Sequence, residues 1–577
     1  MISFTWLDTL AQQHTTLSAI IKQDIFFVGG CVRDTLLGLT QDPKDIDITC
    51  AGDPVKIYEN IDKTNYSHFK TEKFGTMTLI PKDDKSYNFE ITPFRLEASY
   101  DDHRHPNDIE RTNDLIGDAQ RRDFTINCLY YNYLDNKKLS DILSKKETKD
   151  VEHDERITPL DKNGIIYLAD THTLIIQNPE YISNVVKNGS FDSAALLAYT
   201  DMIAVGYTIG QKVKQKWSWL HIVLDPYKWI QDTVARKLRA VGTADKRLYE
   251  DALRIMRAVR IVNVLNHKLL HRETEEKIAT FDFATDTWIS LKKNYYLIQR
   301  VAKERIKDEV CKVFSSWNPF GFIALIDELN ILKWIFPALY ELKWLDQPVR
   351  YHPFDVYNHT LLAVKSLQEI NDDYLTRLGM LYHDVGKKDQ YYMHTVPLDR
   401  EEVRKIFGTW LNHHTSGVDL VKKDFWALGF SKKEIETISW YVANHSKPGE
   451  ILFANESKRE KKMRNMFSDA WYEKVNNILD ITIGDRLGQM NPLQNSSDIS
   501  DVQLLKDILE KLNTQEGQFT MKDLHIDGKT LMKELSLEPW PLLWDLLDKA
   551  FVWVRDNIKI RNTKEKILTY IKENIEK

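Results

Sequence analysis

The chain of 577 residues is long enough for roughly three or four domains, and its composition, 42% hydrophobic and 28% charged, is that of a globular protein. It has no run of about 18 apolar residues and no basic segment followed by an apolar core. We therefore expect no membrane span and no secretory signal, and four scattered cysteines favour a reducing cytoplasm. The net charge of −6 gives no global sign of nucleic-acid binding, so an RNA contact needs a local basic patch.

The first strongly patterned segment leads from an apolar run to a glycine pair. Residues 25–28 predict a buried strand, Gly29 and Gly30 follow it, and residues 31–37 predict the first turns of a helix. A glycine pair at this point lets the backbone approach a phosphate closely, and the helix N-terminus presents unpaired N–H groups to it. The segment is therefore a candidate phosphate site.

A pair of carboxylates, Asp45 and Asp47, follows about fifteen residues later. On a strand, residues i and i+2 point to the same face, so both side chains would project together. Two such carboxylates suggest Mg²⁺, and Mg²⁺ beside a phosphate site suggests phosphoryl or nucleotidyl transfer. A lone glycine pair is usually a turn and a lone Asp-x-Asp is usually solvated, so the order of the parts carries the inference.

The string Gly-Gly-x-Val-Arg-Asp-x-Leu-Leu-Gly at 29–38, followed by Asp-Ile-Asp-Ile-Thr at 45–49, resembles the class II (bacterial-type) tRNA nucleotidyltransferase and poly(A) polymerase family. The resemblance implies an α+β fold: a polymerase-beta-like nucleotidyltransferase head with a small mixed sheet and helices, then an all-α neck, an HD domain and a tail. It implies that Asp45 and Asp47 are catalytic and bind Mg²⁺. The residues that it implies for the triphosphate are Gly29, Gly30, Arg33 and Asp34.

Two further strands are predicted over residues 74–80 and 87–92, joined as a hairpin. If the second strand lies beside the strand of Asp45 and Asp47, Glu90 is a candidate third carboxylate near the metal. A solvated or salt-bridged glutamate is at least as common, so Glu90 ranks below the two aspartates.

The polar stretch 100–106 has no apolar period and is predicted to be a loop. It matches the flexible loop that helps CCA-adding enzymes change from adding C to adding A. Enzymes that add CC alone usually lack this loop, so the resemblance favours addition of the complete CCA sequence.

Residues 121–127, Arg-Arg-Asp-Phe-Thr-Ile-Asn, are compatible with a capped helix start alone. On a helix, Asp123 and Asn127 lie one turn apart and share a face. The string also resembles the ribose-selecting motif of the family. By that resemblance, Asp123 and Asn127 hydrogen-bond a ribose hydroxyl, and the guanidinium groups of Arg121 and Arg122 suit a triphosphate.

Residues 134–220 fit the resemblance poorly. They include a charged stretch at 145–156 and an apolar-patterned stretch at 194–209. We expect an insertion, packed on or beside the catalytic head, whose role the sequence does not indicate.

Residues 247–260 predict a helix on which Glu250, Arg254 and Arg257 share one face. Such a pattern is common in surface salt-bridge ladders. An Asp acceptor beside an Arg donor can also mimic a base-pairing edge. The resemblance implies that Asp251 and Arg254 select CTP and ATP, that Glu250 holds Arg254 in place, and that Arg257 belongs to the same nucleotide site.

Residues 350–490 contain a second set of candidate ligands. The set is His359, His383, Asp384, His413, His445 and Asp485. Each histidine alone is more often structural, but imidazole and carboxylate groups in this order predict a divalent metal site. The order resembles an HD phosphohydrolase domain, which implies hydrolysis of phosphate esters, including 2′,3′-cyclic phosphates, with Mg²⁺, Mn²⁺, Ni²⁺ or a similar ion. His413 fits better than His414, because Gly417 follows at the spacing of the family.

The end of the chain resembles the C-terminal tRNA-binding body of the same enzymes, with Glu-Pro-Trp-Pro at 538–541 in place of the usual Pro-Gly-Pro. Five parts are therefore predicted: nucleotidyltransferase head 1–133, insertion 134–220, nucleotide-reading neck 221–345, HD domain 346–500 and tRNA-binding tail 501–577.

The predicted function is template-independent addition or repair of the 3′-terminal CCA of tRNA from CTP and ATP, with no obligate protein partner. A bacterial poly(A) polymerase, or an enzyme adding only CC or A, shares the head motifs and stays an alternative. The HD domain and the loop at 101–106 argue against the polymerase. An RNA-binding phosphohydrolase with an inactive head is the alternative from another class, and the intact pair of Asp45 and Asp47 argues against it.

Overall fold

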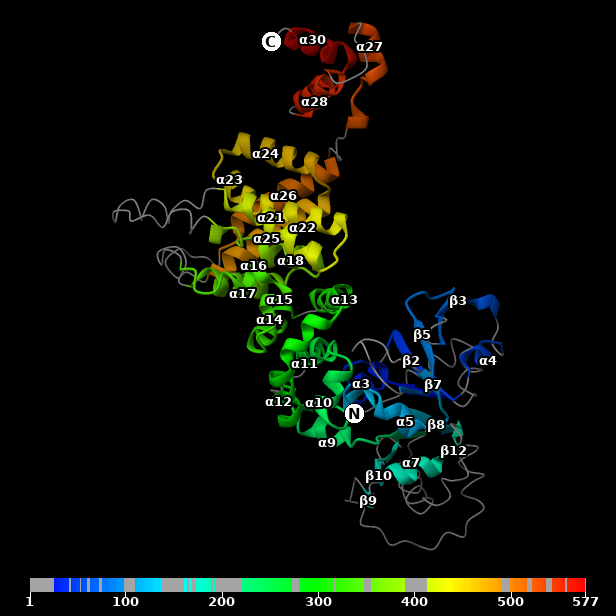
Figure 1. The fold of residues 1–577 in the computed structure, drawn as a ribbon. Coiled ribbons are helices and arrows are strands. Elements are labelled where there is room, and N and C mark those ends of the chain that lie inside the picture. The colour runs from blue at the N-terminus through cyan, green and yellow to red at the C-terminus, as the bar shows by residue number, and fades with distance from the viewer. Residues whose placement is uncertain are drawn as a thin grey trace. The chain divides into compact units, whose positions relative to one another are not determined.

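Two compact units make up the chain, Met1–Val301 and Ala302–Lys577. The computed structural model (Figure 1) describes residues 25–40, 43–51, 53–59, 63–71, 75–97, 109–135, 160–162, 165–168, 173–187, 190–191, 219–271, 280–315, 318–346, 354–389, 412–489, 498–515, 521–535, 542–555 and 558–575. Four predicted features lie outside the described residues: the loop at 100–106, the stretches 145–156 and 194–209, and the Pro-Trp-Pro segment at 539–541.

The first unit is built on a mixed sheet with the strand order β3-β4-β5-β2-β1-β8-β14-β11-β10-β9. These strands are β1 (Ile25–Val28), β2 (Asp45–Cys50), β3 (Tyr66–Thr71), β4 (Thr76–Pro81), β5 (Asn88–Pro93), β8 (Tyr130–Asp135), β9 (Leu160–Lys162), β10 (Ile165–Leu168), β11 (Thr173–Ile176) and β14 (Trp219–Leu224). The pairs β2–β5 and β11–β14 are parallel, and the other pairs are antiparallel.

Helices and short strands complete this unit. The helices are α3 (Gly30–Leu36), α4 (Pro54–Glu59), α5 (Leu115–Gln120), α7 (Pro179–Val185), α9 (Trp229–Val234), α10 (Ala244–Glu250), α11 (Arg254–Leu270) and α12 (Thr285–Asn294), with 3₁₀ turns η1 (Lys63–Asn65), η2 (Thr125–Asn127) and η4 (Tyr295–Arg300). The short strands are β6 (Arg95–Glu97), β7 (Ile109–Arg111), β12 (Val186–Lys187), β13 (Ser190–Phe191), β15 (Lys237–Leu238) and β16 (Asp282–Phe283).

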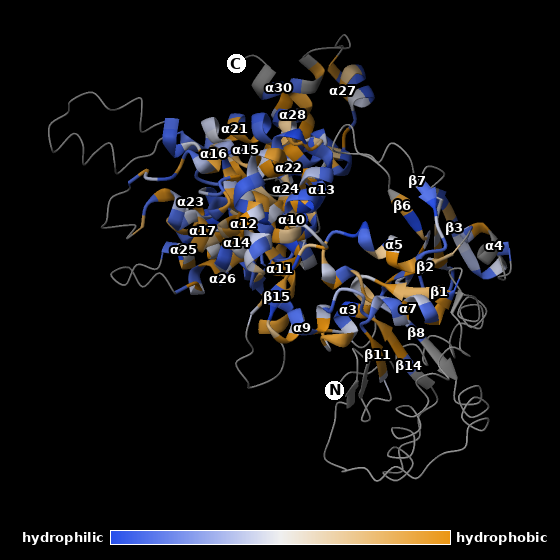
Figure 2. Ribbon diagram, turned by 60° about the horizontal axis from the view of Figure 1, so that its bottom comes forward, coloured by the Kyte–Doolittle hydropathy of each residue, from blue (hydrophilic) through white to orange (hydrophobic). Residues whose placement is uncertain are grey.

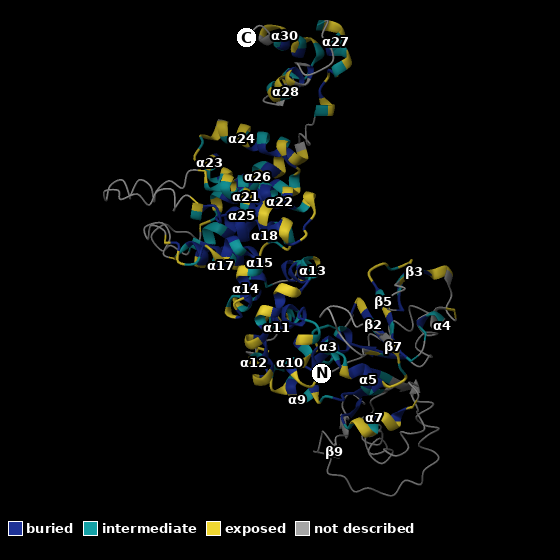
Figure 3. Ribbon diagram, in the orientation of Figure 1, coloured by how far each residue is buried: buried dark blue, intermediate teal, exposed yellow. Residues whose placement is uncertain are grey.

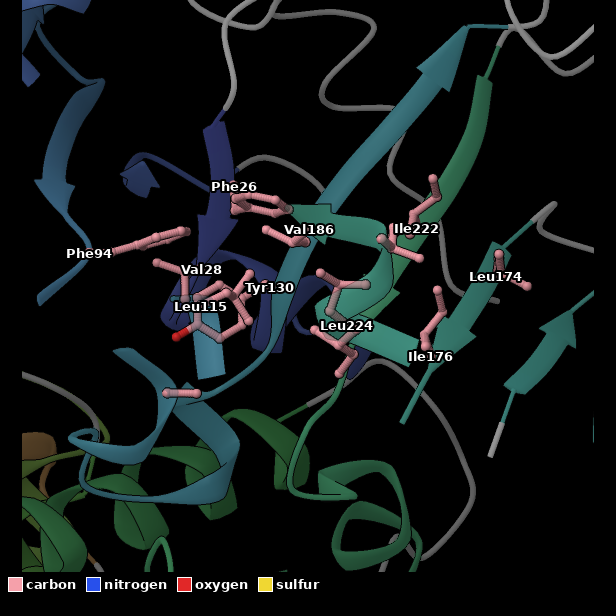
Figure 4. Close-up of a cluster of buried hydrophobic side chains, with 13 residues drawn as sticks. Phe26, Val28, Phe94, Leu115, Tyr130, Leu174, Ile176, Val186, Ile222 and Leu224 are labelled. Carbon is pink, nitrogen blue, oxygen red and sulfur yellow. The ribbon is translucent and has the colours of Figure 1, made fainter. Parts of the chain in front are cut away.

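The sheet buries an apolar face whose side chains follow the two-residue period of a strand. Phe26 and Val28 of β1 share this face with alternate residues of β11 and β14, as Figure 4 shows. The strands β1, β11 and β14 are accordingly rich in hydrophobic residues, coloured orange in Figure 2. Leu115 of α5 and Ile182 of α7 pack against the same cluster. Parts of the predicted insertion 134–220 therefore share a core with the head, and the domain boundaries stay predictions.

The predicted strand–glycine–helix order is confirmed by β1, Gly29 and α3, and the Asp-x-Asp strand by β2. The predicted hairpin is confirmed by β4 and β5, which pair Met77 with Ile91. The helix suggested for 121–127, with Asp123 in its first turn, is wrong: η2 is a single 3₁₀ turn, which β8 follows after two residues.

The continuous helix predicted over 247–260 is also wrong. Helix α10 ends at Glu250, Asp251 is extended, and α11 begins at Arg254. The Asp251 carboxylate accepts a hydrogen bond from the backbone N–H of Leu253 at 3.1 Å. Such local bonding of an aspartate to the backbone competes with helix hydrogen bonds, which explains the break.

In its described residues, the second unit is built of helices. They are α13 (Lys303–Phe314), α14 (Pro319–Glu328), α15 (Leu332–Ile335), α16 (Pro337–Tyr340), α17 (Val356–Leu367), α18 (Tyr374–Tyr382), α21 (His413–Ala427), α22 (Lys432–Asn444), α23 (Lys447–Leu452), α24 (Glu456–Asp469), α25 (Tyr472–Gln489), α26 (Ser500–Gln515), α27 (Gly528–Leu535), α28 (Leu542–Arg555), α29 (Ile558–Arg561) and α30 (Lys564–Ile575), with the 3₁₀ turn η5 (Met521–Asp523). Among the described helices, none has the length and apolar character that a membrane span requires.

Helices α18 and α25 are largely buried, as the dark blue colour in Figure 3 shows. A Cβ at Gly488 of α25 would lie 2.5 Å from the backbone nitrogen of Ala363 in α17, so glycine lets these two helices approach closely. The tail helices α27, α28 and α30 have a core of their own, which includes Leu531, Ala550 and Ile567.

Candidate functional site

The glycine pair and the Asp-x-Asp strand meet in one site. Gly29 has φ 75° and ψ −135°, and a Cβ on it would lie 2.8 Å from Oδ2 of Asp47. Both the backbone conformation and the close approach therefore require glycine at this position. The Asp47 carboxylate accepts a hydrogen bond from the backbone N–H of Gly30, the first residue of α3.

Three carboxylates lie on the two paired strands β2 and β5. Asp45 is exposed and Asp47 is half-buried on β2, and the parallel register pairs Asp47 with Glu90 of β5. Burial, followed by the charge of Glu90, raises the pKa of Asp47 to about 6, although Arg122 opposes the shift. Oxygen ligands that repel one another in this way fit a divalent cation such as Mg²⁺.

Helix α3 also carries Arg33 and Asp34. Arg33 donates from Nε to Asp34 at 2.6 Å and from Nη1 to Oδ1 of Asn127 at 3.4 Å. Its Nη2 lies 3.5 Å from the position of a Cβ on Gly30. The Asp34 carboxylate is buried and accepts a second bond from Nζ of Lys268 at 2.7 Å. Burial would raise the pKa of Asp34, but Arg33 and Lys268 lower it.

Asp118 of α5 forms ion pairs with both Arg121 and Arg122. Its Oδ1 lies 2.7 Å from Nη2 of Arg121, and its Oδ2 lies 2.9 Å from Nη2 of Arg122. Asp118 is fully buried and also accepts a hydrogen bond from the Tyr130 hydroxyl at 2.8 Å. Burial disfavours its charge, but the two arginines outweigh burial and lower the pKa of Asp118 to about 2. Asp118 was not among the residues predicted from the sequence, although its i+3 and i+4 spacing to two arginines is the signal of such a cluster.

Asp123 and Asn127 lie side by side, as predicted, although their segment forms a 3₁₀ turn and not the expected helix. Nδ2 of Asn127 donates to Asp123 at 3.0 Å, and Nη2 of Arg257 on α11 lies 2.6 Å from the other Asp123 oxygen. The predicted ribose motif and the predicted base-reading helix are therefore joined by an ion pair to a buried carboxylate.

Arg254 is buried at the start of α11. Its Nη1 donates to Glu250 at 2.9 Å and to the carbonyl of Arg247 at 2.8 Å, and its Nη2 donates to the carbonyl of Arg121 at 3.0 Å. These bonds fix the guanidinium plane against the loop that carries Arg121. Asp251 lies in the break between α10 and α11, beside Arg254.

The second unit gathers the six predicted HD residues into two groups, His359–His383–Asp485 and Asp384–His413–His445. Within each group, the candidate ligand atoms all lie within 4.8 Å of one another. The histidines come from α17, from the ends of α18 and α22 and from the start of α21, and Asp485 comes from α25. His414 belongs to neither group.

The hydrogen bonds of the histidines suit metal ligation. Nδ1 of His383 bonds the carbonyl of Met380 at 2.8 Å, and Nδ1 of His445 bonds the carbonyl of Val442 at 2.7 Å. Because a carbonyl only accepts, both Nδ1 atoms carry a proton, and the Nε2 lone pairs point to the cluster. Nε2 of His413 lies 3.1 Å from Nε2 of His445, a separation that a shared cation would stabilise. Burial, then the neighbouring histidines, lower the pKa of His445 to about 3, which keeps it a neutral ligand.

Three family models match the chain. They are the poly A polymerase head domain at residues 25–154, the "Probable RNA and SrmB- binding site of polymerase A" at 280–342 and the HD domain at 356–483. The head match contains the Gly29–Asp47 site, and the HD match contains all the cluster residues except Asp485.

Curated relatives are similar over different shares of the chain. A CCA-adding enzyme of Ligilactobacillus salivarius (strain UCC118) is 28% identical over 51% of this chain and 46% of its own length. One of Staphylococcus haemolyticus (strain JCSC1435) is 23% identical over 96% of this chain and 94% of its own. The chain spans about half the length of the first three relatives that it matches.

Among solved structures, the Bacillus stearothermophilus CCA-adding enzyme in complex with CTP is similar at 16% identity and a TM-score of 0.49, over 99% of this chain and 96% of that one. The head, the RNA-binding region and the HD domain occur in this order along the sequence. In these three regions the chain is similar to the poly A polymerase head domain, to a probable RNA-binding region of polymerase A and to the HD domain, and over 96% of its length it is similar to a CCA-adding enzyme.

Proposed function

We propose that this protein is a cytoplasmic tRNA nucleotidyltransferase that adds the 3′-terminal CCA from CTP and ATP without a nucleic-acid template. The observation that carries the proposal is the placement of Asp47 against the Gly29 turn, with Asp45 and Glu90 on the adjoining strands. The similarity to one CCA-adding enzyme over nearly the whole chain supports the choice of substrate.

Asp45 and Asp47 would hold Mg²⁺, with Glu90 beside them. A bound Mg²⁺ lowers the pKa of the primer 3′-hydroxyl and neutralises charge on the departing pyrophosphate. The backbone N–H groups that follow Gly29 and the Nη2 of Arg33 would orient the triphosphate. Arg122, whose charge already lowers the pKa of Asp47, would add positive charge to the site.

Selection of the ribose and the base is proposed for residues at or in contact with the start of α11. Asp123 and Asn127 would bind the ribose, and Arg254 with Asp251 would hydrogen-bond the base. Glu250 would keep the Arg254 guanidinium in one plane, since it already bonds Nη1 of that group. Asp34 would act indirectly, because its buried carboxylate binds Arg33 and Lys268 and repels a triphosphate.

Incubation with tRNA lacking CCA and with each nucleotide, alone and combined, tests the proposal. We expect addition of two C residues with CTP alone and of CCA with CTP and ATP. Long A tails without C would instead identify a poly(A) polymerase, and CC or A alone would identify a partial enzyme. An Asp45→Ala protein that keeps every measured activity would favour a phosphohydrolase with an inactive head.

The HD cluster supports a second proposed activity, hydrolysis of phosphate esters such as 2′,3′-cyclic phosphates at RNA ends. Six ligands in two adjoining groups, with the Nδ1 protons of His383 and His445 held by backbone carbonyls, support a site for one or more divalent ions such as Mg²⁺, Mn²⁺ or Ni²⁺. Hydrolysis of a cyclic phosphate by the wild-type protein, lost in His383→Ala, is the expected result. Equal hydrolysis by both proteins would reject this activity.

A further inference from the structure

Both ends of helix α11 are tied to buried carboxylates of the head. Near its start, Arg257 pairs with Asp123 at 2.6 Å, and in its last turn Lys268 pairs with Asp34 at 2.7 Å. The two contacts are about three helical turns, or about 16 Å, apart. Asp34 and Asp123 are each only 7% exposed, so both carboxylates need cationic partners to stay charged: Arg33 and Lys268 for Asp34, and Arg257 for Asp123.

The two carboxylates are also joined to each other. Arg33 bonds Asp34 through Nε and Asn127 through Nη1, and Asn127 bonds Asp123. The chain of contacts therefore runs from Lys268 through Asp34, Arg33, Asn127 and Asp123 back to α11 at Arg257. Because the two carboxylates of this closed ring are buried and each is held by a cation of α11, the ring restrains α11 relative to α3.

The ring spans the two halves of the proposed nucleotide site. Helix α3 begins at the glycine turn beside Asp47, and α11 begins at Arg254. We propose that Lys268 is a positioning residue for nucleotidyl transfer: through Asp34 it sets the Arg33 guanidinium, and so aligns the triphosphate with a base held by α11. The inference rests on the proposed function and adds to it a residue that would touch neither substrate nor metal.

Lys268 suits this role by its chemistry. Its side chain is 41% exposed, so it reaches a buried carboxylate from the surface. A nucleotide can still bind through either half of the site when α3 and α11 lose their alignment, but the reacting atoms then meet less often in the productive geometry. Loss of Lys268 is therefore expected to lower kcat more than it raises KM.

The test compares Lys268→Met with Lys268→Arg, Asp34→Asn and the double variant, in CTP and ATP addition to tRNA lacking CCA. We expect kcat to fall about tenfold in Lys268→Met with KM changed less than about threefold, and Lys268→Arg to recover most of the rate. The double variant should be no slower than Asp34→Asn alone, because both changes break the same contact. Lys246→Met, an exposed charge removed from neighbouring α10, is the matched control and should behave as wild type.

Thermal unfolding of each variant separates positioning from loss of fold. An unchanged kcat in Lys268→Met, or additive losses in the double variant, would refute this inference alone. A loss of kcat that merely follows a loss of folded protein would refute it as well. Absence of nucleotide addition by the wild-type protein would refute the proposed function, and the inference with it.

Discussion

Glu90 of β5 lies directly opposite Asp47 of β2 in a parallel register. The two side chains come from segments more than forty residues apart, and their charges raise the cost of ionising Asp47. A cation bound at Asp47 removes that cost, so the register itself favours a metal at this point. The relationship makes Glu90 a stronger candidate than its local sequence suggested.

Glu90→Gln is expected to weaken Mg²⁺ use without abolishing nucleotide addition. The Mg²⁺ concentration for half the maximal rate should rise at least about tenfold, because the substitution removes the Glu90 carboxylate beside the ligand Asp47. Titration of the addition rate with Mg²⁺ measures the change. Glu110→Gln, an exposed glutamate on β7, is the control, and an identical Mg²⁺ titration of both variants would contradict the role of Glu90.

Gly29→Ala should damage both folding and nucleotide addition. The backbone conformation at φ 75° costs a residue with a Cβ about 1–3 kcal/mol, and that Cβ would press on the Asp47 carboxylate. Gly242→Ala provides a matched control, because Gly242 also has a positive φ of 64° but open space around the Cβ position. If both variants lose stability and only Gly29→Ala loses addition beyond that, the close approach to Asp47 is functional.

Arg254→Lys should relax base selection. A lysine keeps the charge but cannot bond Glu250 and two backbone carbonyls in one plane, so the orientation of the group is lost. We expect kcat/KM for CTP and ATP to fall about ten- to a hundredfold, with a smaller change for GTP and UTP. Glu250→Gln should give the same pattern in weaker form. Equal losses for all four nucleotides would show a structural role alone.

Asp118→Asn should lower the stability of the head by about 3 kcal/mol, because it leaves two arginines without their buried carboxylate. The pKa of Asp118 is lowered from 3.8 to about 2, so its ionised form stabilises the fold above pH 3.8, and this contribution is lost as the pH falls towards 2. Urea unfolding at neutral and acid pH measures both effects. Asp282→Asn, in the exposed pair with Lys237, should change stability by less than about 1 kcal/mol.

The HD cluster predicts different outcomes for two adjacent histidines. His413→Ala removes a candidate ligand and should lower the bound divalent metal and the hydrolysis of cyclic phosphates, whereas His414→Ala should leave both unchanged. Elemental analysis of the purified proteins reports the metal directly. Retention of the full metal content by His413→Ala would argue against its place in the site.

Local sequence was sufficient to predict the strand, the glycine turn and the Asp-x-Asp strand of the first candidate site, because each of these elements spans only a few residues. The apolar run at 25–28, the glycine pair and the alternation of Asp45 and Asp47 depend on strand and turn geometry over a few residues. The same reasoning failed at 247–260, where the side chain of Asp251 competes with the helix for backbone hydrogen bonds. Periodicity records which residues share a face of a helix, but not whether a polar side chain interrupts it.

Tertiary structure decided which distant charges meet. The parallel pairing of β2 with β5 placed Glu90 beside Asp47, and the packing of α11 on the head joined Lys268 to Asp34. The order of the HD residues along the chain predicted a metal site, and folding arranged them in two adjoining groups that include His413 and exclude His414. Sequence patterns describe neighbours along one element, whereas the pairing of buried charges depends on strand register and helix packing, which are set by the burial of the whole core.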